Sequence, residues 1–144
     1  MVKQACKLRH IALSVPDVAA AQKFFEEAFG MTKAGNAQNG VHMTDGIMNV
    51  ALLAKGGQVP GIEHLYYGVM HFGMWVDDLD QAEKKVVDAG GKYLAGRPEP
   101  AKPGQPANAH SYYEAKYKDP LGIVFDLTHT GWIGAVKDVV AAKN

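Results

Sequence analysis

Two segments of the chain alternate between apolar residues and polar or small ones. Residues 9–15 read RHIALSV and residues 70–76 read MHFGMWV, and alternation with a period of two predicts a β-strand in both places. Each strand carries a histidine, His10 or His71, on the face opposite its apolar residues. The apolar faces are Ile11, Leu13 and Val15 in the first strand and Phe72, Met74 and Val76 in the second.

A helix is predicted directly after each strand. Asp17 and Asp78 suit the N-cap position, because a carboxylate can accept from the free backbone N–H groups of the first turn. Gly30 ends the first helix as a C-cap, and Gly90-Gly91 end the second. Apolar residues at helical spacing form one face of each helix: Val18, Ala21, Phe25 and Ala28 in the first, and Leu79, Ala82, Val86 and Ala89 in the second.

Short extended segments follow each helix, at about 31–36, 40–44 and 47–54, and again at about 92–95, 112–118 and 123–129. Each half therefore has the order βαβββ, over about residues 8–54 and 69–129 of a single domain spanning 1–144. The expected fold is α+β, with the two repeats forming a curved mixed sheet, an open barrel, around a central cavity. Residues 55–68 form a connector, residues 96–110 a long proline-rich loop, and about 133–143 a short C-terminal helix.

The two halves are also alike in sequence. Residues 10–35 and 71–96 agree at nine positions when they are aligned without gaps, and His10 then matches His71. A duplicated unit with pseudo-twofold symmetry brings equivalent positions face to face. Small neighbours, Ala12 and Gly73, leave room beside the two rings. Because neutral imidazole is the commonest metal ligand, the pair indicates a metal site.

The last strand supplies a carboxylate. In GIVFDLTHT, alternation places Asp126 between Val124 and Thr128 on one face of an otherwise apolar segment. A buried carboxylate is costly unless it is paired or coordinates a cation. Asp126 with His10 and His71 would form a three-ligand site that suits Fe, Mn, Zn or Ni and leaves coordination positions open for a substrate.

Composition narrows the class of partner. Lys plus Arg and Asp plus Glu number 15 each and form no basic run, which argues against nucleic acid or an anionic membrane as partner. No apolar stretch has the length of a membrane span, and the N-terminus lacks the apolar core of a signal peptide. The single cysteine, Cys6, excludes an internal disulfide and fits a cytoplasmic location.

Three motifs resemble those of the vicinal oxygen chelate superfamily: LRHIALSVPDVAAAQKFFEEAFGM, MHFGMWVDDLDQAEKKVVDAGG and YKDPLGIVFDL. That group includes glyoxalase I, methylmalonyl-CoA epimerase, extradiol dioxygenases, fosfomycin-resistance proteins and metal-free bleomycin-binding proteins. The resemblance covers about residues 8–129. It implies metal ligands on the first and last strands of each half, which here gives His10, His71 and Asp126. Asp126 stands where the family usually has the longer Glu, so its strand must lie closer to the ion.

The fourth ligand position of some family members falls on residues 47–54. Aligning Gly46-Ile47 with Gly122-Ile123 puts Val50 opposite Asp126, and a slip of one residue would offer Asn49 or Ala51. Val50 cannot bind a metal and Asn49 is at best a poor ligand, so the pattern is that of a three-ligand member. The same alignment turns Met48, Val50 and Leu52 toward the cavity. With Trp75 they would form a largely apolar wall for a hydrophobic substrate, unless they simply fill the core.

The segment HSYYEAKYKDP has two possible registers. One turns Tyr113, Ala115 and Tyr117 inward, and the other turns Tyr112, Glu114 and Lys116 inward. Either could place a general acid or base beside the metal. Tyr113, Glu114 and Lys116 are therefore the catalytic candidates.

These observations favour a divalent-metal-dependent enzyme acting on a small, hydrophobic, oxygen-chelating substrate. The three-ligand pattern favours a ring-cleaving dioxygenase or a transferase, whereas the small size of the chain favours a lyase, an isomerase or a resistance protein. The alternative is a non-catalytic protein that sequesters a hydrophobic compound. Unpaired sheet edges and the resemblance both lead us to expect a homodimer.

Overall fold

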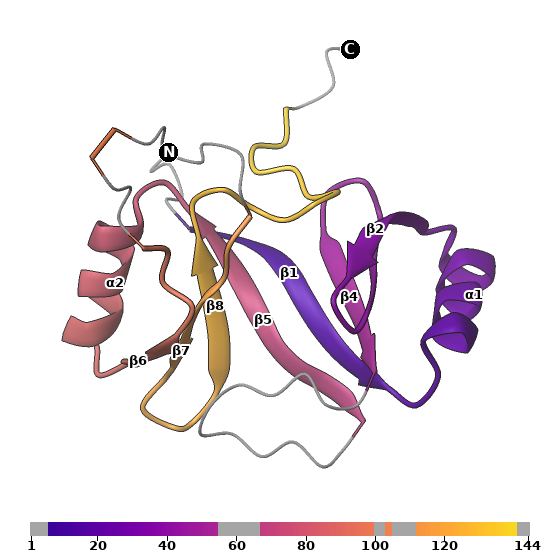
Figure 1. Ribbon diagram of the computed structural model, residues 1–144, viewed down its shortest axis with the longest axis horizontal. Coiled ribbons are helices and arrows are strands. Elements are labelled where there is room, and N and C mark those ends of the chain that lie inside the picture. Colours follow the sequence, from indigo (N-terminus) through magenta and orange to yellow (C-terminus); the bar gives the residue numbers. More distant parts are fainter. Residues whose placement is uncertain (1–5, 55–66, 100–102, 105–111, 141–144) are drawn as a thin grey trace.

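The computed structural model describes residues 6–54, 67–99, 103–104 and 112–140. Eight strands form one mixed sheet in the order β2-β3-β4-β1-β5-β8-β7-β6, and the two helices lie at its opposite ends (Figure 1). The elements are β1 (Cys6–Val15), α1 (Val18–Phe29), β2 (Thr32–Ala37), β3 (Gly40–Thr44), β4 (Asn49–Ala54), β5 (Gly68–Val76), α2 (Leu79–Asp88), β6 (Lys92–Ala95), β7 (Ala115–Lys118) and β8 (Val124–Thr128). The predicted α+β fold with two βαβββ repeats is confirmed.

The first strands of the two halves join in the middle of the sheet. β1 pairs antiparallel with β5, with His10 opposite Gly73 and Ala12 opposite His71. Each of these strands has the last strand of its own half as its parallel neighbour, β4 beside β1 and β8 beside β5. The repeat therefore places its two histidine strands next to each other, with a small residue across from each ring.

Both predicted helix starts are confirmed. The Asp17 carboxylate accepts from the backbone N–H of Ala20 at 2.9 Å, and the Asp78 carboxylate accepts from that of Gln81 at 3.0 Å. Gly30 ends α1 in the left-handed conformation, with φ 66°. One apolar cluster lies beneath α1 and contains Val41, Met43 and Leu52. The other joins Leu79 and Ala82 of α2 to four residues of the sheet: Val76, Ala115, Tyr117 and Leu127.

The register of β4 differs from the sequence alignment by one residue. Ala12 pairs with Ala51 in the first half, and its equivalent Gly73 pairs with Asp126 in the second, so Ala51 rather than Val50 matches Asp126. A slip of one residue moves every side chain of a strand to its other face. Val50 and Leu52 accordingly pack in the cluster under α1. The expectation that they face the cavity is wrong.

The C-terminal segment does not form the expected helix in its described part, because residues 131–140 contain only turns, bends and irregular backbone. Arg9 of β1 holds this segment by donating to the carbonyl of Val136 at 2.7 Å and to that of Lys137 at 3.0 Å. Trp132 is 4% exposed and packs over Gly73, where an added Cβ would lie 2.4 Å from the indole ring. Tertiary contacts thus replace the helical hydrogen bonds.

Most of the expected connector at 55–68, most of the long loop at 96–110, and the end of the expected C-terminal helix lie outside the described residues. Within the described ranges, no helix has the length and apolar character that crossing a membrane requires. The structure contains one chain, so the homodimer stays a prediction.

The face assignment of β4 can be tested with two neighbouring leucines. Leu52 is fully buried under α1, whereas Leu53 is half-buried on the opposite face. We expect Leu52→Ala to lower the free energy of unfolding by about 2–5 kcal/mol, the range for a buried leucine. Leu53→Ala should cost less than half as much. Urea denaturation of both variants measures this difference, and equal or reversed costs would contradict the register.

Candidate metal centre

Three buried side chains converge between β1, β5 and β8. The Nε2 atoms of His10 and His71 lie 3.4 Å apart. Oδ2 of Asp126 lies 3.1 Å from Nε2 of His71 and 3.8 Å from Nε2 of His10. All three residues are at most 7% exposed. The structure thus brings together the trio that the sequence selected from three separate strands.

The geometry of the trio fits a divalent cation. Nitrogen and oxygen ligands lie about 2.0–2.2 Å from such an ion, which places neighbouring ligand atoms about 3.0–3.5 Å apart. The observed separations, from 3.1 to 3.8 Å, lie close to that range. Oδ2 of Asp126 is buried without a hydrogen bond among the described residues, although an ion-pair distance joins it to His71. A buried carboxylate oxygen facing two ring nitrogens is a suitable place for a cation.

The electrostatics favour the ligand forms of these groups. Burial lowers the pKa of His10 to about 4, although Glu114 and Asp126 oppose the shift. His10 is therefore neutral near pH 7 and keeps a lone pair for a metal. Burial opposes ionisation of Asp126, but the interactions with His71 and Lys116 outweigh it and hold the pKa of this carboxyl below its usual value.

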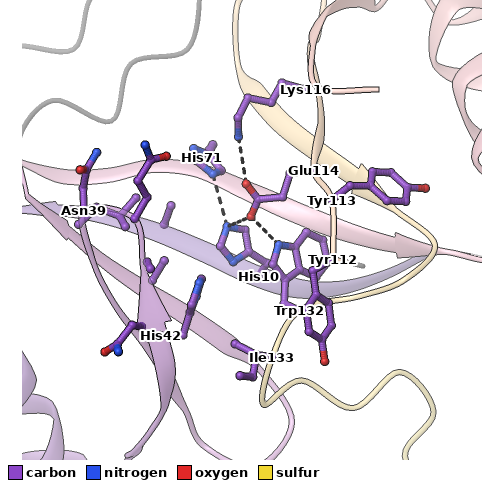
Figure 2. Close-up of a pocket in the computed structure, with 16 residues that line it drawn as sticks. His10, Asn39, His42, His71, Tyr112, Tyr113, Glu114, Lys116, Trp132 and Ile133 are labelled. Carbon is purple, nitrogen blue, oxygen red and sulfur yellow. Dashed lines mark hydrogen bonds and ion pairs between the residues drawn. The ribbon is translucent and has the colours of Figure 1, made fainter. Parts of the chain in front are cut away.

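Charged side chains lie next to the trio, and Figure 2 shows two of them, Glu114 and Lys116, beside His10 and His71. Nζ of Lys116 donates to Oδ1 of Asp126 at 2.9 Å and to Oε2 of Glu114 at 3.4 Å. Oε1 of Glu114 accepts from the indole N–H of Trp132 at 2.7 Å and lies 3.6 Å from Nε2 of His10. Burial disfavours the Lys116 ammonium, yet Asp126 and Glu114 raise its pKa above the usual value. Asp126 thus accepts from Lys116 through Oδ1, while its Oδ2 faces the two histidines.

These contacts decide between the two registers predicted for residues 112–118. Glu114 and Lys116 point into the site, and the exposed Tyr112 lines the same cavity. Ala115 and Tyr117 pack beneath α2 instead. Of the two predicted registers, the one that turns Tyr112, Glu114 and Lys116 inward is therefore correct.

Two aromatic candidates, Tyr113 and Trp75, hydrogen-bond to His129 and not to a member of the trio. Tyr113 lines the edge of the cavity, and its hydroxyl pairs with Nδ1 of His129 at 2.5 Å. Burial raises the pKa of this hydroxyl. Trp75 does not line the described cavity, because its ring packs over Gly131 and its N–H donates to the carbonyl of His129 at 3.0 Å. The expected wall role of Trp75 is therefore wrong.

Trp132 provides the aromatic wall instead. Its ring stacks on His10, with the centroids 4.8 Å apart and the planes 7° apart. Sequence reasoning did not select this residue, because it follows the last strand and reaches His10 only through the tertiary fold. The missing side chain at Gly73 was the one local signal of a ring packed there.

A cavity of about 640 Å³ lies beside the trio. Its walls include amide side chains from β2 and the β2–β3 turn, namely Asn36, Gln38 and Asn39, together with His42 and the small residues Ala12 and Ala51. Leu53 lines it, whereas Val50, Leu52 and Met48 do not. The expected largely apolar pocket is therefore corrected to one of mixed character.

Burial of His10 makes the metal-free protein sensitive to acid. The pKa of His10 is about 4 when folded against 6.5 when unfolded, so the unfolded chain takes up the proton first as pH falls. Neutral His10 therefore makes its full contribution to the free energy of unfolding above pH 6.5, and this contribution is lost as the pH falls toward 4. We expect the free energy of unfolding to fall by about 2 kcal/mol from this group between about pH 7 and pH 5. Urea denaturation with a chelator present measures it, and an unchanged pH slope in His10→Gln would contradict the assignment.

No curated protein sequence matches the chain significantly. Among solved structures, a hypothetical protein from Bacillus halodurans C-125 is 15% identical with a TM-score of 0.64, and the alignment covers 86% of this chain and 94% of that one. Methylmalonyl-CoA epimerase from Mycobacterium tuberculosis is 17% identical with a TM-score of 0.62, over 83% and 85% of the two chains.

The 2,3-dioxygenase LapB from Pseudomonas sp. KL28 is 15% identical with a TM-score of 0.60. That alignment covers 90% of this chain but 42% of the dioxygenase, so this chain corresponds to under half of that enzyme. Identities this low show a shared fold alone. The family comparison goes further, because residues 7–127 match the profile of one superfamily. The chain therefore belongs to the Glyoxalase/Bleomycin resistance protein/Dioxygenase superfamily, the vicinal oxygen chelate group that its motifs resemble.

Proposed function

We propose that this protein is a divalent-metal-dependent enzyme whose small substrate presents two adjacent oxygen atoms to the ion. The observation that carries the proposal is the convergence of His10, His71 and Asp126, with Oδ2 of the aspartate buried and without a hydrogen bond among the described residues. One ring nitrogen from each histidine and one carboxylate oxygen, all atoms of the kind that ligate divalent cations, face a common point. The open cavity beside them supports access by a substrate.

Each nearby residue has a proposed role. His10, His71 and Asp126 would hold the ion, which when bound would act as a Lewis acid toward a developing oxyanion. Lys116 acts together with His71 to keep Asp126 ionised, and it fixes the orientation of the carboxylate through Oδ1. Glu114 is the proposed general base, because its carboxylate faces the cavity 3.6 Å from Nε2 of His10. Tyr113 is given no role here, because it packs against the cluster of Ala115 and Tyr117 and its hydroxyl pairs with His129.

Glu114 favours proton transfer, as in an isomerase or lyase. The carboxylate is half-buried and held by Trp132 and Lys116, so it has a defined position beside the ligand atoms. Glu114 could take a proton from a carbon next to a carbonyl of the substrate, which would leave an enolate. Similarity in fold to an epimerase is consistent with this chemistry.

A ring-cleaving dioxygenase is the second candidate. Two histidines and one carboxylate, with other coordination positions open, form the ligand set typical of non-haem Fe(II) oxygenases. Ala51 occupies the position in the first half that matches Asp126, so β4 adds no fourth ligand there. Similarity in fold to a 2,3-dioxygenase supports keeping this candidate.

Metal binding tests the carrying observation. We expect the metal-free protein to bind one Mn²⁺, Zn²⁺ or Ni²⁺ per chain in isothermal titration calorimetry. Removing a direct ligand in His71→Ala should weaken binding by more than about 100-fold, which exceeds the usual effect of an outer-shell residue. His129→Ala is the matched control, because His129 is exposed and outside the trio. A wild-type protein that binds organic ligands equally well with and without chelator would instead support sequestration.

Glu114→Gln tests the proton-transfer role. The amide keeps an acceptor oxygen for Trp132 but is not a base, so the rate constant should fall by about 10²–10⁴ while metal affinity changes little. The measurement is solvent deuterium incorporation, by NMR, into a panel of compounds with a hydroxyl beside a carbonyl. Glu27→Gln, on the exposed surface of α1, is the control. Oxygen consumption with catechols, confined to the Fe- or Mn-loaded protein, would favour the dioxygenase instead.

A further inference from the structure

Asn49 is fully buried at the start of β4, directly opposite His10 in the parallel pairing of β1 and β4. Its side chain makes three hydrogen bonds. Oδ1 lies 2.7 Å from Nδ1 of His10, and Nδ2 lies 2.8 Å from the carbonyl oxygen of Ile133 and 3.1 Å from Nδ1 of His42. The amide thus uses its oxygen on the ligand ring and its nitrogen on two other elements.

These partners determine how the amide is oriented. The carbonyl oxygen of Ile133 can only accept, so it must face the NH₂ group of Asn49. Oδ1 then faces His10, and an acceptor 2.7 Å from Nδ1 requires the proton to be on Nδ1. The lone pair of His10 is consequently on Nε2, the atom that faces His71 and Asp126. The same logic makes Nδ1 of His42 an acceptor.

The same amide also holds a wall of the cavity. Ile133, whose carbonyl it binds, directly follows Trp132, and Trp132 stacks on the His10 ring. Asn49 therefore holds the edge of the His10 ring directly. Through the Ile133 carbonyl it also supports Trp132, the residue that covers the face of that ring. His71 has no such support, because its Nδ1 is buried without a hydrogen-bond partner among the described residues.

We propose that Asn49 is a positioning residue with two linked roles: it selects the Nδ1–H form of His10 and fastens the 131–134 loop that walls the cavity. The first role serves the metal site and therefore rests on the proposed function. Both roles are nevertheless properties of the metal-free protein. Asn49 is not a ligand, since its oxygen is engaged by His10 and the ligand atoms lie on the far side of that ring.

Three variants separate the two roles. Asn49→Leu removes every hydrogen bond of the amide at similar volume. Asn49→Asp keeps an acceptor for His10 but removes the donors to Ile133 and His42. His42→Ala removes one contact of Asn49 and leaves the other two, so it is the matched control.

Titration with Mn²⁺ measures the effect on the metal. We expect Asn49→Leu to weaken binding by about 10- to 100-fold, as for other outer-shell partners of metal ligands, and Asn49→Asp and His42→Ala to stay within about threefold. Binding by Asn49→Leu within about threefold of wild type would overturn the first role. Acrylamide quenching of Trp132, taken as the difference from Trp132→Phe, should rise in both Asn49 variants and not in His42→Ala. Unchanged quenching would overturn the second role.

A readout without metal keeps this inference separate from the proposed function. Long-range ¹H–¹⁵N NMR of the metal-free wild type, with ¹⁵N-labelled histidine, should show His10 protonated at Nδ1 and not at Nε2. The opposite form would overturn the inference whether or not metal binds, and it decides the matter if Asn49→Leu fails to fold. Failure of the wild type to bind any metal, with His10 still protonated at Nδ1, would refute the proposed function and leave the role of Asn49 in place.

Discussion

The antiparallel pairing of β1 with β5 is the contact on which the rest of the site depends. It sets two equivalent strands side by side, so residues with the same place in each repeat meet near one axis. His10 and His71 then share a face, and Gly73 and Ala12 are small enough to let their rings approach. A side chain at Gly73 would collide with both Trp132 and His10. One strand pairing and one missing side chain therefore account for the closeness of the two imidazoles.

The second constraint is the burial of Asp126. A carboxylate inside a protein needs compensation on each oxygen. Lys116 provides it for Oδ1 from the neighbouring strand, where the two residues are directly paired, and Oδ2 faces the histidines. Glu114 in turn is held by Trp132 and Lys116. The acidic and basic groups of the site are thus linked in one network, so their protonation states depend on one another.

Sequence reasoning was most accurate where a local pattern or the repeat determined the structure. Asp17, Asp78 and Gly30 act within their own helices, and His10 with His71 follows from the duplication, so both kinds of feature could be predicted. The register of β4 could not, because the turns before β4 and β8 differ: Asp45 accepts from the backbone N–H of Met48, three residues on, whereas Asp119 accepts from that of Ile123, four residues on. A shift of one residue moves every side chain of the strand to its other face. The C-terminal segment and Trp132 depend on Arg9, Gly73 and His10, which are distant in sequence, and such contacts override local helical preference.

The register of β4 has a stereochemical consequence. Ala51 stands where exact symmetry would place a second carboxylate, so the two halves of the cup are chemically unequal although their backbones correspond. The anionic and cationic side chains come from β7, β8 and Glu114, which directly precedes β7. The first half instead contributes amides, an imidazole and apolar side chains, from β2, β3, β4 and the β2–β3 turn. A molecule bound between the two halves would therefore have charged side chains on one side and mainly amide and apolar side chains on the other. In the proposed reaction, a prochiral centre held there would offer only one of its two faces to Glu114. The two halves are related by an approximate twofold rotation, but their side chains differ, so the site between them is asymmetric.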